Sequence, residues 1–295
     1  MTVQPDARRP LSLAIARPRL RTPSRRLWIA AVPVLVFTLI AIVGPVAVPY
    51  DHVDTDLLSR LKPPLTELRS GIAWFGTDQT GRDLFGQVIH GARVSLIVGF
   101  PTVFIAGIVG ALTGIVAGLR GGWVDDVLMR IADIQLALPA FLLAILIAAV
   151  IGPSVTNVVL TLALTRWVVF ARVARGSTVA VREREFVDSA RLLGASRWRL
   201  MRRHILPLAI TPLLIVATTQ FGLVILAEAS LSFLGLGVPT NVPSWGQTIA
   251  SGRDYIGTAW WIATMAGLVL ALVTIGFGVF GDTLRDELDP RMKGR

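Results

Sequence analysis

Residues 185–207 read EFVDSARLLGASRWRLMRRHILP, a water-soluble stretch that lies between long apolar runs. Gly194 suits the C-terminal end of a helix because glycine enters the left-handed conformation freely, and the hydroxyl of Ser196 can cap a following helix. The stretch therefore predicts two short helices that meet at positions 194–196. Ala190 and Gly194 lie four residues apart on one helix face, where their small size lets another protein approach closely. We expect this helical pair to be a cytoplasmic docking surface.

The apolar runs on either side indicate an integral membrane protein. Of the 295 residues, 53% are hydrophobic, and the mean hydropathy is +0.66. A membrane span needs about 20 apolar residues to cross roughly 30 Å of hydrocarbon. We predict an all-α bundle of six transmembrane helices, at residues 27–48, 94–119, 132–151, 155–170, 208–226 and 260–280. The first run is longer than a signal-peptide core of roughly 7 to 15 residues, so it is expected to remain as a span.

The distribution of charge predicts the orientation of the chain. The formal net charge is +10, and it is concentrated in residues 1–26 and 171–203, which are both rich in arginine. Cytoplasmic segments of membrane proteins carry an excess of Lys and Arg. With six spans, both arginine-rich segments and both termini then face the cytoplasm. The positive-inside rule accounts for the arginines, and the helical pair is tethered to spans at both ends, so a DNA-binding function is rejected.

The spans divide the chain into parts with different surroundings. Residues 1–26 form a basic cytoplasmic arm, and 49–93 form an extracytoplasmic loop that is expected to run into an interfacial helix. The five-span core covers 94–280 and contains the cytoplasmic loop 177–207. Residues 281–295 form a cytoplasmic tail.

Three glycines of the second predicted span, Gly110, Gly114 and Gly118, repeat every four residues. Such small-xxx-small steps place glycines along one helix face and let another helix cross closely. The partner helix is either in the same subunit or in a neighbouring one.

No catalytic, cofactor-binding or metal-binding constellation is visible, so the chain is not expected to be an enzyme. It contains no cysteine, its three histidines at 52, 90 and 204 are far apart, and no GxxxxGK[ST] phosphate-binding loop occurs. Asp125, Asp126 and Asp133 could in principle hold a metal ion. Their position near a predicted helix start, where the helix dipole favours acids, explains them better.

Two ionisable residues within apolar runs are functional candidates by default. Glu228 lies near the outer end of the fifth run, where it either stabilises a break in the helix at 231–235 or lines a translocation path. Arg166 in the fourth run either extends its side chain to the inner interface or faces a watery cavity.

The stretch 185–207 resembles the EAA loop of bacterial ATP-binding-cassette (ABC) importer permeases. That pattern is Glu-Ala-Ala, three residues, Gly, nine residues, Ile, one residue and Leu-Pro. Here Asp188, Ser189, Ala190 and Gly194 match at the same spacing, followed by LP at 206–207. Asp replaces Glu, Ser replaces Ala, and His204 replaces Ile. The shorter carboxylate of Asp puts the strength of one contact in doubt.

Further motifs resemble the C-type permease subunit of dipeptide and oligopeptide importers over residues 27–292. They include FGTDxxGRD at 75–83, LAEASLSFLGLG at 226–237, PSWG at 243–246 and GDTLRDELDPR at 281–291. The first and third contain the outer-loop candidates Asp78, Arg82, Asp83 and Trp245.

The resemblance implies a type I importer permease fold in the bacterial inner membrane, with a coupling helix between spans four and five. It implies a heterodimeric pore with a homologous B-type permease, two cytoplasmic ATPase subunits that bind ATP and Mg²⁺, and an extracytoplasmic solute-binding protein. Coupling to the ATPases then falls to Asp188, Ser189, Ala190, Arg191 and Gly194. No cofactor is expected on this chain itself.

Two alternatives remain at this point. The same architecture could carry nickel chelates, heme or glycosides. A stand-alone secondary carrier is disfavoured, because neither paired midplane charges nor inverted repeats of broken helices are visible.

Overall fold

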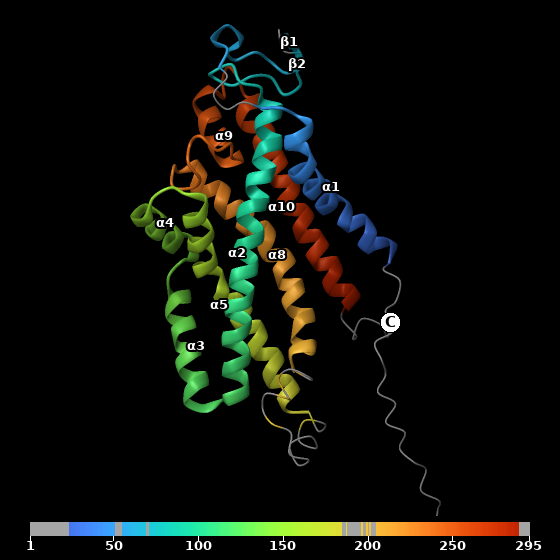
Figure 1. Cartoon of the computed structure of the whole chain (residues 1–295), viewed down its shortest axis with the longest axis vertical. Coiled ribbons are helices and arrows are strands. Elements are labelled where there is room, and N and C mark those ends of the chain that lie inside the picture. The colour runs from blue at the N-terminus through green and yellow to red at the C-terminus, as the bar shows by residue number, and fades with distance from the viewer. Residues whose placement is uncertain are drawn as a thin grey trace, which may run out of the picture.

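The computed structural model describes residues 24–50, 55–68, 71–184 and 205–288, together with the single positions 187, 196, 199 and 201. Long helices dominate these residues and run roughly along one axis (Figure 1). Five helices are long and apolar enough to cross a membrane: α1 (Arg25–Ala47), α2 (Leu84–Arg120), α5 (Val155–Arg182), α8 (Leu206–Phe233) and α10 (Trp261–Leu288).

The sixth crossing is a bent pair of helices. Helices α3 (Gly122–Ala137) and α4 (Ala140–Ile151) meet at 85°. We predicted one continuous span over 132–151, and this was wrong. Leu138 is extended, with ψ of 134°, because a residue before proline is disfavoured in the helical conformation, and Pro139 follows it. With the pair taken as one crossing, the six-helix fold is confirmed.

Small elements form the cap above the bundle in Figure 1. They are η1 (Leu57–Ser59), the antiparallel strands β1 (Thr66–Leu68) and β2 (Gly71–Ala73), α9 (Trp245–Gly252) and η3 (Arg253–Tyr255). The sequence did not predict the two strands, which are only three residues long. No separate interfacial helix precedes the second span in the described residues, because α2 is continuous from Leu84.

The glycine face of α2 packs against α5 of the same chain. A Cβ added at Gly110 or Gly114 would collide with the backbone of α5, at Trp167 and Ala171 respectively. At Gly118 it would lie 2.8 Å from Cβ of Thr178. The close helix crossing predicted from the sequence is therefore within this subunit, and it fixes the centre of the bundle.

Ion pairs join α3 to α5 at the end of the bundle opposite the cap. Arg175 donates to both carboxylate oxygens of Asp125, with Nη2 to Oδ2 at 2.6 Å. Arg172 donates to Asp133 over 2.7 Å, and both side chains of this second pair are half-exposed. These acids thus serve helix packing, and no group of three metal-ligating side chains occurs among the described residues.

Candidate functional site

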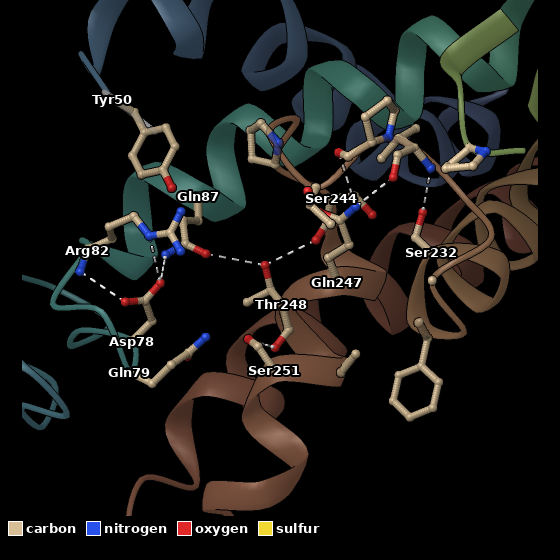
Figure 2. Close-up of a pocket in the computed structure, with 18 residues that line it drawn as sticks. Tyr50, Asp78, Gln79, Arg82, Gln87, Ser232, Ser244, Gln247, Thr248 and Ser251 are labelled. Carbon is tan, nitrogen blue, oxygen red and sulfur yellow. Dashed lines mark hydrogen bonds and ion pairs between the residues drawn. The ribbon is translucent and has the colours of Figure 1, made fainter. Parts of the chain in front are cut away.

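A polar cavity of about 530 Å³ lies in the cap (Figure 2). Its walls come from the outer loop before α2, the first turn of α2, Pro153 between α4 and α5, the end of α8, the segment 235–243 and α9. Helix α8 ends here because Gly235 adopts the left-handed conformation, with φ of 76°, and its N–H bonds to the carbonyl of Ser232. The chain can then turn back and place α9 beside the start of α2.

Asp78 organises the loop side of the cavity. Its Oδ1 accepts hydrogen bonds from the backbone N–H of Thr80 at 2.8 Å and of Arg82 at 3.0 Å. Its Oδ2 accepts from the Gln87 amide at 2.7 Å and pairs with Nε of Arg82 at 3.2 Å. Only 2% of Asp78 is exposed. The carboxylate therefore holds the 75–83 motif in shape and joins it to α2.

Arg82 lies between Asp78 and the ring of Tyr50 in Figure 2. Burial raises the pKa of the Tyr50 phenol to about 12, although the Arg82 guanidinium counteracts part of this effect. Tyr50 thus stays protonated at neutral pH, and its hydroxyl can donate a hydrogen bond at the edge of the cavity.

Asp83 caps the N-terminus of α2. Its Oδ2 accepts from the N–H of Gly86 at 2.8 Å, and its Oδ1 accepts from Phe85 at 3.4 Å. Burial raises the pKa of Asp83, and the two backbone hydrogen bonds offset this only in part. The role of Asp83 is to start the helix that carries Gln87 into the cavity wall.

Trp245 joins α9 to α2 and does not line the polar cavity. Its side chain is fully buried, and its indole N–H donates to the carbonyl of Val88 at 2.8 Å. The ring lies over Gly91, where a Cβ would come within 2.6 Å of it. Only glycine at 91 permits this close packing, so Trp245 fixes the position of the cavity's α9 wall.

Glu228 lies directly behind the cavity wall and is fully buried. Its Oε1 accepts hydrogen bonds from the hydroxyls of Ser232 at 2.8 Å and Ser244 at 3.1 Å. Both serines line the cavity. Its Oε2 has no hydrogen-bond partner among the described residues. The carboxyl group thus ties the end of α8 to the residue before α9, and only two hydroxyls separate it from the cavity.

Arg166 is not part of this site. It lies in the middle of α5, half-buried, and its Nε is buried without a hydrogen-bond partner within the described part of the chain.

The predicted coupling residues Asp188, Ser189, Ala190, Arg191 and Gly194 lie outside the described residues. Close to them, the hydroxyl of Ser196 accepts from the N–H of Arg199 at 3.3 Å. This is the capping geometry that the sequence predicted for Ser196.

The sequence analysis missed the polar residues of α2 and α9 that complete the wall. Thr248 donates to the carbonyl of Ser244 at 3.1 Å and contacts Gln87 at 3.5 Å, while Gln247 donates to the carbonyl of Val238 at 2.7 Å. Their only sequence signal was the neighbouring PSWG motif.

Five apolar helices of span length, six crossings with the bent pair counted as one, and a polar cavity at one end characterise the described residues as those of a multi-pass membrane protein. Residues 110–294 match the family described as "Binding-protein-dependent transport system inner membrane component". The chain belongs to this family, and the resemblance to ABC importer permeases is confirmed.

Several curated relatives are similar over nearly the whole chain. The "Probable D,D-dipeptide transport system permease protein DdpC" of Escherichia coli (strain K12) is 40% identical over 90% of this chain and 88% of its own length. The "Di/tripeptide transport system permease protein DppC" of Pseudomonas aeruginosa is 41% identical over 88% and 86%. The "Glutathione transport system permease protein GsiD" of Pectobacterium atrosepticum is 35% identical over 92% and 93%.

Proposed function

We propose that this chain is a permease subunit of an ATP-driven importer and forms half of the translocation pore for dipeptides and oligopeptides. The observation that carries this proposal is the 40% identity over 90% of the chain to a permease named for D,D-dipeptide transport. A di/tripeptide permease is similarly close, which favours peptides over nickel chelates, heme or glycosides.

The proposed assembly contains a homologous B-type permease, two ATPase subunits in the cytoplasm and an extracytoplasmic solute-binding protein. ATP and Mg²⁺ belong to the ATPases, and this chain is non-catalytic. Asp188, Ser189, Ala190, Arg191 and Gly194 form the face that docks on an ATPase. Glu228 borders the substrate route at its outer end, through the hydroxyls of Ser232 and Ser244, and Arg166 borders it further along α5.

Cargo is tested with proteoliposomes that contain the complete importer, its binding protein and ATP. We expect uptake of a labelled dipeptide that unlabelled dipeptides and tripeptides inhibit. Glutathione is the informative competitor, because a relative at 35% identity is named for its transport. Stronger inhibition by a nickel chelate, heme or a glycoside would replace the peptide proposal. Stronger inhibition by glutathione, itself a tripeptide, would make it the preferred peptide cargo, and uptake without the ATPases would indicate a secondary carrier.

Coupling is tested with Gly194→Trp, which places a large side chain on the proposed docking face. We expect ATP hydrolysis that no longer drives uptake, in a complex that still inserts in the membrane. The matched control is Gly176→Trp, at a helical position where an added Cβ meets no atom within 4 Å. Normal transport by Gly194→Trp would contradict the assigned docking face.

A further inference from the structure

A second, apolar cavity of about 910 Å³ lies along the seam between α1 and α10, and Phe75 and the first turns of α2 also line it. Its floor is buried: Phe37 is 3% exposed and Trp245 is fully buried. Its rim is open, with Leu272 66% and Val36 48% exposed. We call this cavity the seam groove. It is separate from the polar cavity, with which it shares none of its lining residues.

Polar character is confined to one end of the seam groove. The indole N–H of Trp245 donates to the carbonyl of Val88. The only other polar residues that line the groove are Arg26 and Thr283. Arg26 lies in the first turn of α1, and Thr283 lies near the end of α10. The backbone N–H of Ser24 donates to Oε1 of Glu287 at 3.1 Å, which holds these two helix ends together. The groove therefore has a polar mouth, where Arg26 lines the cavity and the Glu287 carboxylate lies nearby on Ser24, and an apolar body.

The dimensions of the seam groove suit one acyl chain. Its α1 wall extends from Arg26 to Ile40, and 14 residues at a rise of 1.5 Å span about 21 Å. One leaflet contributes half of the roughly 30 Å of membrane hydrocarbon, so a chain from one leaflet fits in this length. Along the same wall α1 and α10 touch, since a Cβ on Gly276 would lie 2.8 Å from Cβ of Pro33. Such a crevice does not admit a helix about 10–12 Å across.

We propose that the seam groove binds one anionic phospholipid of the inner leaflet, with its phosphodiester at Arg26 and an acyl chain between α1 and α10. Arg26 has no ion pair within the described part of the chain. A guanidinium group matches phosphate oxygens through paired hydrogen bonds. The inference rests on the cytoplasmic N-terminus that the charge distribution predicts. It does not depend on the transported cargo. The lipid would hold α1 on the bundle, because this helix is little buried by the rest of the chain.

The headgroup contact is tested on the full chain, purified with its co-expressed subunits and supplied with phosphatidylglycerol or phosphatidylcholine. Retained lipid is counted by native mass spectrometry. We expect Arg26→Ala to reduce retained phosphatidylglycerol about tenfold. The matched control is Arg25→Ala. It removes the same charge from the neighbouring residue, which does not line the groove. General attraction to an anionic surface is worth about 1 kcal/mol per basic residue, a factor of about five, so the control loses less.

The acyl-chain contact is tested with phosphatidylglycerol that carries a diazirine in one chain. We expect crosslinks to peptides of α1 and α10 in the wild type. Val36→Trp, which fills the groove, should remove them, whereas Leu39→Trp on the exposed outer side of the same helix should not. Equal effects of the two arginine variants, equal retention of phosphatidylcholine, or crosslinks outside α1, α10 and the groove-lining start of α2 would overturn the proposal. Capture of a protein helix between α1 and α10 would overturn it too. The wild-type crosslinks decide the question if a variant fails to fold.

Discussion

Glu228 shows how one buried side chain supports the polar cavity. Glu228→Gln keeps a carbonyl oxygen in reach of Ser232 and Ser244, whereas Glu228→Leu leaves both hydroxyls without this acceptor. A buried polar group without its partner costs about 1–3 kcal/mol. We expect the thermal unfolding midpoint of the detergent-purified protein to fall clearly in the Leu variant and little in the Gln variant. Equal losses would mean that an acceptor oxygen for the two serine hydroxyls does not explain the contribution of the carboxyl group to stability.

Asp83 predicts a dependence of stability on pH. Because the pKa of Asp83 is raised in the folded protein, the folded state holds this proton more tightly than the unfolded chain does. The resulting stabilisation is complete below the unfolded pKa of about 3.9 and is lost as pH rises through the folded pKa. Asp83→Asn keeps a capping oxygen but cannot ionise. It should raise the unfolding midpoint at neutral pH and lose this advantage in acid. A variant that is less stable at both pH values would show that the amide caps α2 poorly.

The contact between α2 and α5 gives a prediction for whole helices. Gly114→Ala places a methyl group against the backbone of Ala171, which has no room to move. At Gly107, an added Cβ would have its nearest neighbour, a ring carbon of Phe170, at 3.7 Å, which is an ordinary contact. Overpacking typically costs about 1–3 kcal/mol. Gly114→Ala should therefore lower the unfolding midpoint and the yield of folded protein, and Gly107→Ala should change neither. Equal tolerance at both positions would mean that the two helices are further apart than described.

The sequence predicted helices better than it predicted their breaks. Apolar runs identify spans because lipid requires them, and repeated glycines identify a helix crossing. The bend at Pro139 was missed because the run 132–151, apolar apart from Asp133 and Gln135, is long enough for one span, although the residue before proline was a local signal. The bonds from Ser244 to Glu228 could not be predicted, since they depend on how the chain turns after Gly235. The docking surface was predicted from the small residues Ala190 and Gly194, its use for coupling to an ATPase was inferred from resemblance, and both remain predictions.

Orientation is a property of the whole molecule and can be measured directly. Because the chain contains no cysteine, single cysteines report without background. Leu57, in the outer loop, and Trp123, in the first turn of α3, are 67% and 76% exposed. In intact cells a membrane-impermeant maleimide should label Leu57→Cys and not Trp123→Cys, which should react only after permeabilisation. The reverse pattern would place the N-terminus outside and would contradict the proposed side for the ATPases.

Helix α2 has 37 residues, so it is about 55 Å long and exceeds the roughly 30 Å of hydrocarbon. Its first turn carries Gln87 into the polar cavity, and its last turn accepts a hydrogen bond from Arg182 at the carbonyl of Gly118, at 2.9 Å. The helix is continuous from end to end, but Pro101 near its middle lacks a backbone N–H and is a position at which a bend is expected. If α2 tilts as one rigid body during transport, its two ends move in opposite directions. Spin labels near both ends would then keep a constant separation in every nucleotide state while each moves against the rest of the bundle.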